Sequence, residues 1–90
     1  MDQETMLQAL KVDLGITTTA YDVRLAQYLS SAAAAITIEG INLTDSISDC
    51  NLIVMYAAWL WKKRDTAEGM PRMLRWMMNN RLFSQKLSED

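Results

Sequence analysis

The 90-residue sequence contains no histidine, which removes the most common general base and metal ligand of proteins. Its single cysteine, Cys50, can form neither an internal disulfide nor a Cys–His nucleophile pair, and a cysteine-based zinc site is excluded as well. The three glycines stand singly, so there is no glycine-rich loop to hold a phosphate. We therefore expect that the protein is not an enzyme.

Turn-forming residues are also scarce, with one proline and three glycines. This scarcity favours a few helices with short connections over many strands. The length suits a single domain, and a hydrophobic share of 50% with a charged share of 22% is ordinary for a folded protein. The polar start of the chain, residues 1–4, has no apolar signal core, so we expect a cytoplasmic protein in which Cys50 is a small buried side chain.

The longest uncharged apolar run, Leu52–Trp61, is followed by three basic residues. Ten residues are about half of what a bilayer-spanning helix needs, so no membrane segment is expected. The run predicts a helix over about residues 46–65 with two apolar faces. One face holds Ile53, Ala57, Leu60 and Trp61, and the other holds Leu52, Met55, Tyr56 and Trp59. Such a helix is either central to its own domain or shared between subunits.

The whole pattern predicts an all-α fold, a small bundle of about four helices around this central apolar helix. The expected helices cover about residues 3–14, 20–39, 46–65 and 71–82. Asp2 and Gly15 are the expected caps of the first helix, one of Thr18 and Thr19 should cap the second, and Ser46 and Asp49 have near-capping-box spacing. Residues 1–83 are expected to form one domain and residues 84–90 a flexible tail.

The fourth predicted helix places an aromatic side chain on its outer face. Leu74, Met77 and Met78 share the inner face. The outer face carries Arg72, Trp76 and Asn80, with Phe83 beyond them. Trp, Arg and Met are enriched at the centres of protein interfaces, so this outer face is a candidate contact surface.

Charge is distributed unevenly along the chain. Residues 1–50 carry two basic and seven acidic residues, a net charge of −5, whereas residues 51–90 carry seven basic and four acidic residues, a net charge of +3. Copies of such a molecule could stack head to tail, acidic part against basic part. Alternatively, the basic half could face DNA, or Lys62, Lys63 and Arg64 could simply complement a helix dipole.

The residues alone leave three interpretations. The first is a subunit of a homo-oligomer or larger assembly. The second is a small helical DNA-binding or regulatory domain that uses Lys62 to Arg64, Arg72 and Arg75, although the chain is acidic overall. The third is a monomeric helical bundle or interaction module whose apolar residues cover its own core.

Several segments together resemble one family: Met6-Leu7-Gln8-Ala9-Leu10-Lys11, Tyr21-Asp22, Met55-Tyr56-Ala57-Ala58-Trp59-Leu60, Gly69-Met70-Pro71-Arg72-Met73-Leu74 and Asn79-Asn80-Arg81-Leu82-Phe83. The chain resembles the small head–tail connector, or adaptor, proteins of tailed bacteriophages and prophages. The resemblance implies an all-α subunit of a ring, typically dodecameric, that lies beneath the portal protein of the virion after assembly in the bacterial cytoplasm. Such a ring extends the DNA channel, through which DNA passes without specific binding. It also provides a docking surface for stopper or tail-completion proteins, and it needs no cofactor.

The family has no catalytic motif, so the candidate residues follow from helix geometry. Leu52, Met55, Tyr56 and Trp59 are the candidates for subunit or interhelix packing. Arg72, Trp76, Asn80 and Phe83 are the candidates for contact with a neighbouring subunit or with the portal.

Overall fold

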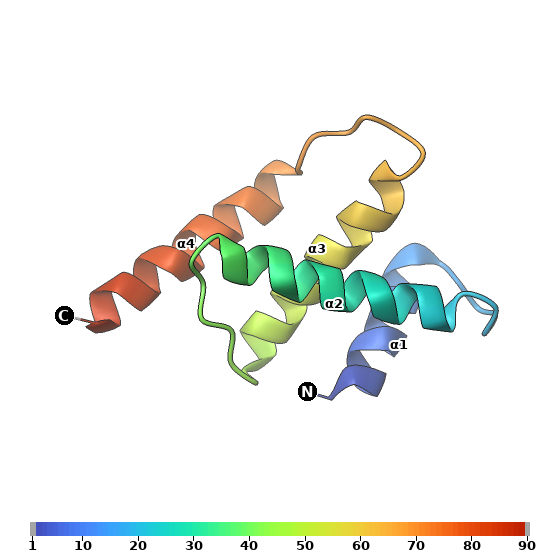
Figure 1. The fold of residues 1–90 in the computed structure, drawn as a ribbon, viewed down its shortest axis with the longest axis horizontal. Helices are drawn as coiled ribbons and strands as arrows, with labels where there is room; N and C mark the ends of the chain where they lie inside the picture. Colours follow the sequence, from blue (N-terminus) through green and yellow to red (C-terminus); the bar gives the residue numbers. More distant parts are fainter. Residues whose placement is uncertain (1, 90) are drawn as a thin grey trace.

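The computed structural model describes residues 2–89 and consists of four α-helices, with no strand in that range (Figure 1). The helices are α1 (Gln3–Leu14), α2 (Asp22–Ile38), α3 (Ile47–Lys63) and α4 (Arg72–Glu89). The predicted all-α fold of about four helices is therefore confirmed.

Helix α3 packs against each of the other three helices, and α1 also packs against α2. Helix α4 makes most of its interhelix contacts with α3. It lies at the opposite side of the molecule from α1, as Figure 1 shows, and the molecule measures 46 Å along its longest axis. Helix α4 therefore has one long side that faces away from the other helices.

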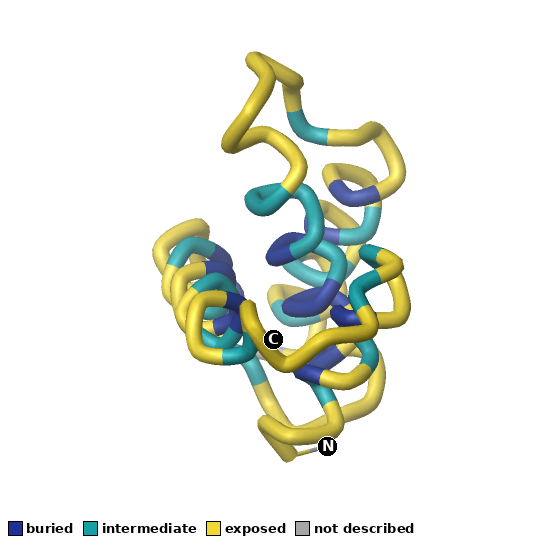
Figure 2. The backbone as a smooth tube through the Cα atoms, turned by 90° about the vertical axis from the view of Figure 1, so that its right-hand side faces the viewer, coloured by how far each residue is buried: buried dark blue, intermediate teal, exposed yellow. Residues whose placement is uncertain are grey.

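The core is formed where the helices face one another, and the outer sides and the α3–α4 connection are exposed (Figure 2). Burial of apolar side chains is the main favourable term for such a fold. The buried apolar residues come from all four helices and from one loop position, Ile41: Leu7, Leu10, Leu25, Leu29, Ala32, Ile36, Ile41, Cys50, Leu52, Ile53, Val54, Tyr56, Ala57, Leu74 and Met78.

The predicted start and end of the first helix are confirmed. The carboxylate of Asp2 accepts a hydrogen bond from the backbone N–H of Thr5 (2.8 Å), which satisfies one free donor of the first turn. Hydrogen bonds from the hydroxyl and the backbone N–H of Thr5 hold the pKa of Asp2 below its ordinary value. Gly15 ends the helix with φ of +71°, a left-handed conformation that costs glycine little.

The predicted cap of the second helix is wrong. Helix α2 begins at Asp22, and the preceding Tyr21 makes no side-chain capping bond. Thr19 contributes its backbone carbonyl, which accepts from the N–H of Asp22 (3.2 Å). The Asp22 carboxylate lies 2.8 Å from the ammonium of Lys11, which is buried. An ion pair therefore joins α1 to the first residue of α2.

The start of α3 agrees with the predicted cap and adds to it. The hydroxyl of Ser46 accepts from the backbone N–H of Asp49 (3.1 Å). In a capping box the Asp49 carboxylate would bond to the N–H of Ser46. It accepts instead from the N–H and the hydroxyl of Thr44 (2.8 and 2.9 Å). The carboxylate therefore fixes the loop before the helix.

The fourth helix is longer than predicted. It continues to Glu89, so the segment expected as a tail, residues 84–90, is helical as far as the structure describes it, and Asp90 lies outside the described residues. The helix continues because Gln85 has partners in the α2–α3 loop: its amide donates to the carbonyl of Gly40 (2.8 Å), and its oxygen accepts from the N–H of Asn42 (2.7 Å).

Candidate functional site

The second apolar face of α3 is divided by burial into two parts. Leu52 is 2% exposed and Tyr56 is 9% exposed, so both belong to the core of the chain itself. Burial and the nearby Glu39 carboxylate raise the pKa of Tyr56, and the Arg75 guanidinium opposes the shift. Arg75 on α4 and Glu39 after α2 form an ion pair with each other (3.0 Å). For Leu52 and Tyr56 the predicted packing is therefore between helices of one chain.

Met55 and Trp59, the other two residues of that face, are partly exposed. They line a surface hollow of about 490 Å³, which is completed by Asp13, Ala58, Lys62, Glu68 and Pro71. The ring of Trp59 packs edge-on against the ring of Tyr56, with 5.4 Å between the ring centroids. The ammonium of Lys63 lies 4.4 Å from the centroid of the Trp59 ring. Trp59 is thus held by its own helix, and its contact with another subunit stays a prediction.

Four of the large apolar side chains that are exposed in the described residues lie on α4. Trp76 is 60% exposed and Phe83 is 63% exposed, and Met73 and Leu87 are exposed to the same degree. Asn80, between the two aromatic residues, is also exposed. We call these five residues the α4 stripe: Met73, Trp76, Asn80, Phe83 and Leu87.

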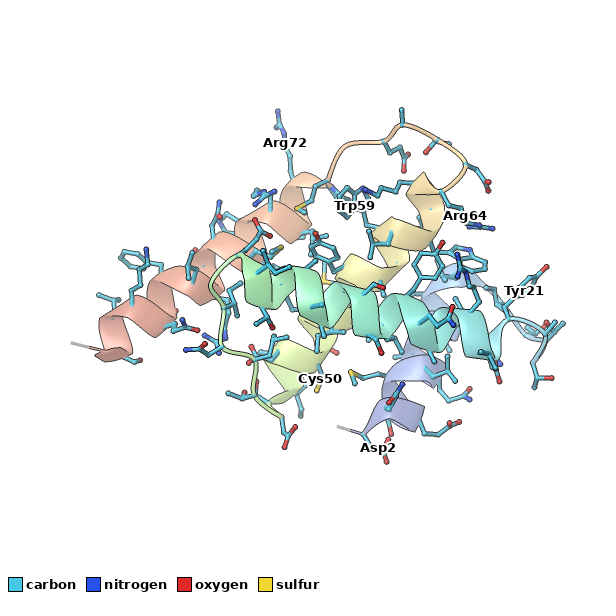
Figure 3. All side chains as sticks on the ribbon, in the orientation of Figure 1. Asp2, Tyr21, Cys50, Trp59, Arg64 and Arg72 are labelled. Carbon is cyan, nitrogen blue, oxygen red and sulfur yellow. The ribbon has the colours of Figure 1, made fainter. Side chains whose placement is uncertain are left out.

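The α4 stripe follows the alternating spacing of three and four residues that places side chains along one side of a helix. It therefore runs along α4 from near its start to near its end. Arg72 and Lys86 flank the stripe; both are exposed, and neither has an ion-pair partner among the described residues. Figure 3 shows Arg72 extending away from the body of the molecule. Arg72, Trp76, Asn80 and Phe83, the four predicted contact residues, are all on the surface.

The inner face of α4 is fixed by apolar and ionic contacts. Leu74 and Met78 are buried against the core. The guanidinium of Arg81 binds both carboxylate oxygens of Asp49, with N–O distances of 2.7 and 3.1 Å, and it also donates to the carbonyl of Asn42 (2.7 Å). Paired, planar hydrogen bonds of this kind are among the strongest and most directional in proteins. They set the rotation of α4 and so keep the stripe outward.

Electrostatics favour the ionised form of this pair. Burial disfavours the Asp49 carboxylate, which is 1% exposed, but the hydrogen bonds from Arg81 and Thr44 outweigh the burial and hold its pKa below the ordinary value. The hydrogen bonding between Arg81 and Asp49 also raises the pKa of Arg81. A further ion pair, Arg75 with Glu39 (3.0 Å), joins the start of α4 to the end of α2.

The basic residues considered for DNA binding are mostly engaged within the chain. The guanidinium of Arg64 lies 3.7 Å from the ring centroid of Trp61, and Lys63 lies over Trp59. Arg75 is paired with Glu39. Cation–π and ionic contacts of this kind hold a cation beside its partner and reduce its freedom to follow a phosphate backbone.

Two features of the site were missed in the sequence. The Asp49–Arg81 pair joins residues 32 positions apart, and no local pattern predicts which distant partner a charged residue selects. The second feature is that Met73 and Leu87 extend the outer face of α4. Met73 lies three residues before Trp76 and Leu87 four residues after Phe83, a spacing that places them on the same side of a helix. Leu87 was missed because the predicted helix ended near Leu82.

The described residues contain no group of three or more histidine, cysteine or acidic side chains placed to hold a metal ion. Within the same range, no helix has the length and apolar character to cross a bilayer. Comparisons with family models, with curated proteins and with solved structures found no match to the chain. The α4 stripe therefore rests on its own geometry as the candidate functional surface.

Proposed function

We propose that the protein is a non-catalytic structural subunit that works in an assembly, and that the α4 stripe is a contact surface of that assembly. The observation that supports this most is the exposure of Trp76 and Phe83 on a helix whose other face is firmly anchored. Two large aromatic side chains in water forgo the burial that stabilises a fold, and a partner that covers them recovers it.

The sequence resemblance gives this proposal its specific form. The assembly is a ring of copies of this chain at the head–tail junction of a tailed-phage virion, beneath the portal protein. The ring extends the DNA channel and offers a docking surface to stopper or tail-completion proteins. Support comes from the small all-α fold, from the stripe, and from the opposite net charges of the two halves of the sequence.

Electron microscopy of the purified full-length chain over a range of concentrations tests the proposal. We expect closed rings with a central channel at high concentration. Particles of one subunit at every concentration, with intact helical circular dichroism, would contradict self-assembly.

DNA binding is the second function that the basic half of the sequence raises, and the same sample tests it. A channel subunit should bind duplex DNA weakly and without sequence preference. An affinity for one duplex sequence well above that for scrambled DNA, falling steeply with added salt, would favour the DNA-binding alternative.

A further inference from the structure

The surface at the other end of the molecule from α4 is recessed and has acidic residues beside it, whereas the α4 stripe projects large side chains and has cations beside it. Between the start of α1 and the first half of α2 lies a shallow groove of about 540 Å³, lined by Gln3, Val23, Ala26, Gln27, Ser30 and Ser31. We call it the α1–α2 groove. In Figure 1, α1 and the first half of α2 lie at one end of the molecule and α4 at the other.

We propose that the α4 stripe of one copy docks in the α1–α2 groove of a second copy, so that the subunits join head to tail. This inference rests on the proposed function, because it names the partner of the surface assigned there.

The two surfaces complement each other in side-chain size. The stripe projects Trp76 and Phe83, and the groove is lined on α2 by the small side chains of Ala26, Ser30 and Ser31. Large aromatic side chains that fill a recess of small residues are typical of the centres of interfaces. Val23, which is exposed at the groove, adds an apolar contact on the same helix.

The two surfaces also complement each other in charge. The stripe is flanked by the exposed cations Arg72 and Lys86, and Gln3 in the groove lies between the exposed residues Asp2 and Glu4 in the sequence. Arg24, on the groove helix, is turned to its own neighbours: it bonds to Gln27 (3.0 Å) and lies 5.4 Å from the ring centroid of Tyr28. Opposite charges attract across a head-to-tail contact.

A symmetric contact between two α4 stripes is disfavoured by the same charges. It would bring Arg72 and Lys86 of one copy near the same cations of the other, and residues 72–88 of α4 contain no Asp or Glu to separate them. A head-to-tail contact leaves a free stripe on one subunit and a free groove on the other. It therefore continues until the chain of subunits closes into a ring or extends as a filament.

Mixing two blocked variants tests this arrangement. Trp76→Ala with Phe83→Ala removes the stripe and keeps the groove, whereas Ser30→Arg with Glu4→Lys fills the groove, reverses a charge beside it and keeps the stripe. Sedimentation velocity should find each variant monomeric alone and the equimolar mixture as a dimer that grows no further. Ile38→Ala, at an apolar side chain on α2 that is exposed and outside both surfaces, should assemble as the wild type does.

The outcomes separate the inference from the proposed function. If the wild type assembles but the mixture stays monomeric, or if either blocked variant assembles like the wild type, the head-to-tail contact is wrong and the assembly uses another surface. If the wild type stops at a dimer that the stripe variant abolishes and the groove variant keeps, the contact is symmetric and the inference is also wrong. If the wild type is monomeric at all concentrations, the proposed assembly fails as well.

Discussion

The pair of Asp49 and Arg81 shows how single residues orient the candidate surface. Asp49 is 1% exposed, and its carboxylate accepts two hydrogen bonds from Thr44 in the loop before α3. Arg81, on α4, donates two further hydrogen bonds to the same carboxylate. Taking a carboxylate out of water is costly unless its charge is compensated, so neither residue can be replaced without consequence for the other.

Arg81→Met should lower the free energy of unfolding by about 3 kcal/mol at neutral pH, because it leaves the buried Asp49 carboxylate without its cation. Urea unfolding followed by circular dichroism measures the change. Arg72→Met is the matched control, since Arg72 is exposed and should change stability by less than about 0.5 kcal/mol. Equal losses in the two variants would show that the pair does not stabilise the fold.

Acid should remove the stabilisation that this pair provides. The pKa of Asp49 is lower in the folded protein than its ordinary value of 3.8, so the folded state binds the proton less readily than the unfolded state. The contribution to stability is therefore complete above about pH 4 and is lost as pH falls below that value towards the folded pKa. Urea unfolding at a series of pH values should show a steeper acid loss for the wild type than for Asp49→Asn. Parallel curves would contradict the assigned role.

At the scale of the element, α4 has one anchored face and one free face. Leu74 and Met78 pack in the core, and Trp76 lies in solvent although it is only two residues away from each of them. Helical geometry places such neighbours on different sides. The division predicts opposite consequences for substitutions on the two faces.

Trp76→Ala should lower the free energy of unfolding by only about 1 kcal/mol, because Trp76 is 60% exposed. Leu74→Ala should cost about 3 kcal/mol, since it opens a cavity in the core. Thermal unfolding of the two variants beside the wild type measures both effects. A loss of several kcal/mol for Trp76→Ala would show that the side chain is core, and the α4 stripe would not be a contact surface.

Gln85 fixes the last part of α4 to the α2–α3 loop. Gln85→Ala removes the bonds to Gly40 and Asn42, and we expect a loss of about 1–2 kcal/mol. Hydrogen exchange should show faster exchange for the amide of Asn42 and for the final turns of α4. Unchanged exchange in both segments would mean that the helix end does not depend on this contact.

Element boundaries were predictable where local chemistry determines them. Asp2 and Gly15 bound α1 as their side-chain and backbone preferences predict. The end of α4 was not predictable, because the partners of Gln85 lie 43 and 45 positions earlier in the chain. Tertiary contacts override local composition in such segments, and the mostly polar segment 84–88 resembles a tail until its partners are known.

At the scale of the whole molecule, the anchored and free surfaces give the chain two distinct ends. The α4 stripe with its two cations lies at one end, and α1 with its exposed acidic residues lies at the other. Trp76, Asn80 and Phe83 of the α4 stripe were predicted from the sequence as an outer face, whereas the groove depends on how α1 packs against α2 and was not predicted. Burial also assigned Leu52 and Tyr56 to the chain's own core, a choice that periodicity alone left open.

The central claim is that this chain works as an assembled subunit and that the α4 stripe contributes to the assembly. Sedimentation equilibrium over a range of concentrations, for the wild type and for Trp76→Ala, tests it most directly. The claim predicts a wild-type mass that rises above the 10.2 kDa of one chain, and a rise that is weaker in a Trp76→Ala protein of unchanged helical content. A mass of 10.2 kDa for the wild type at every concentration, or identical curves for the two proteins, would contradict it.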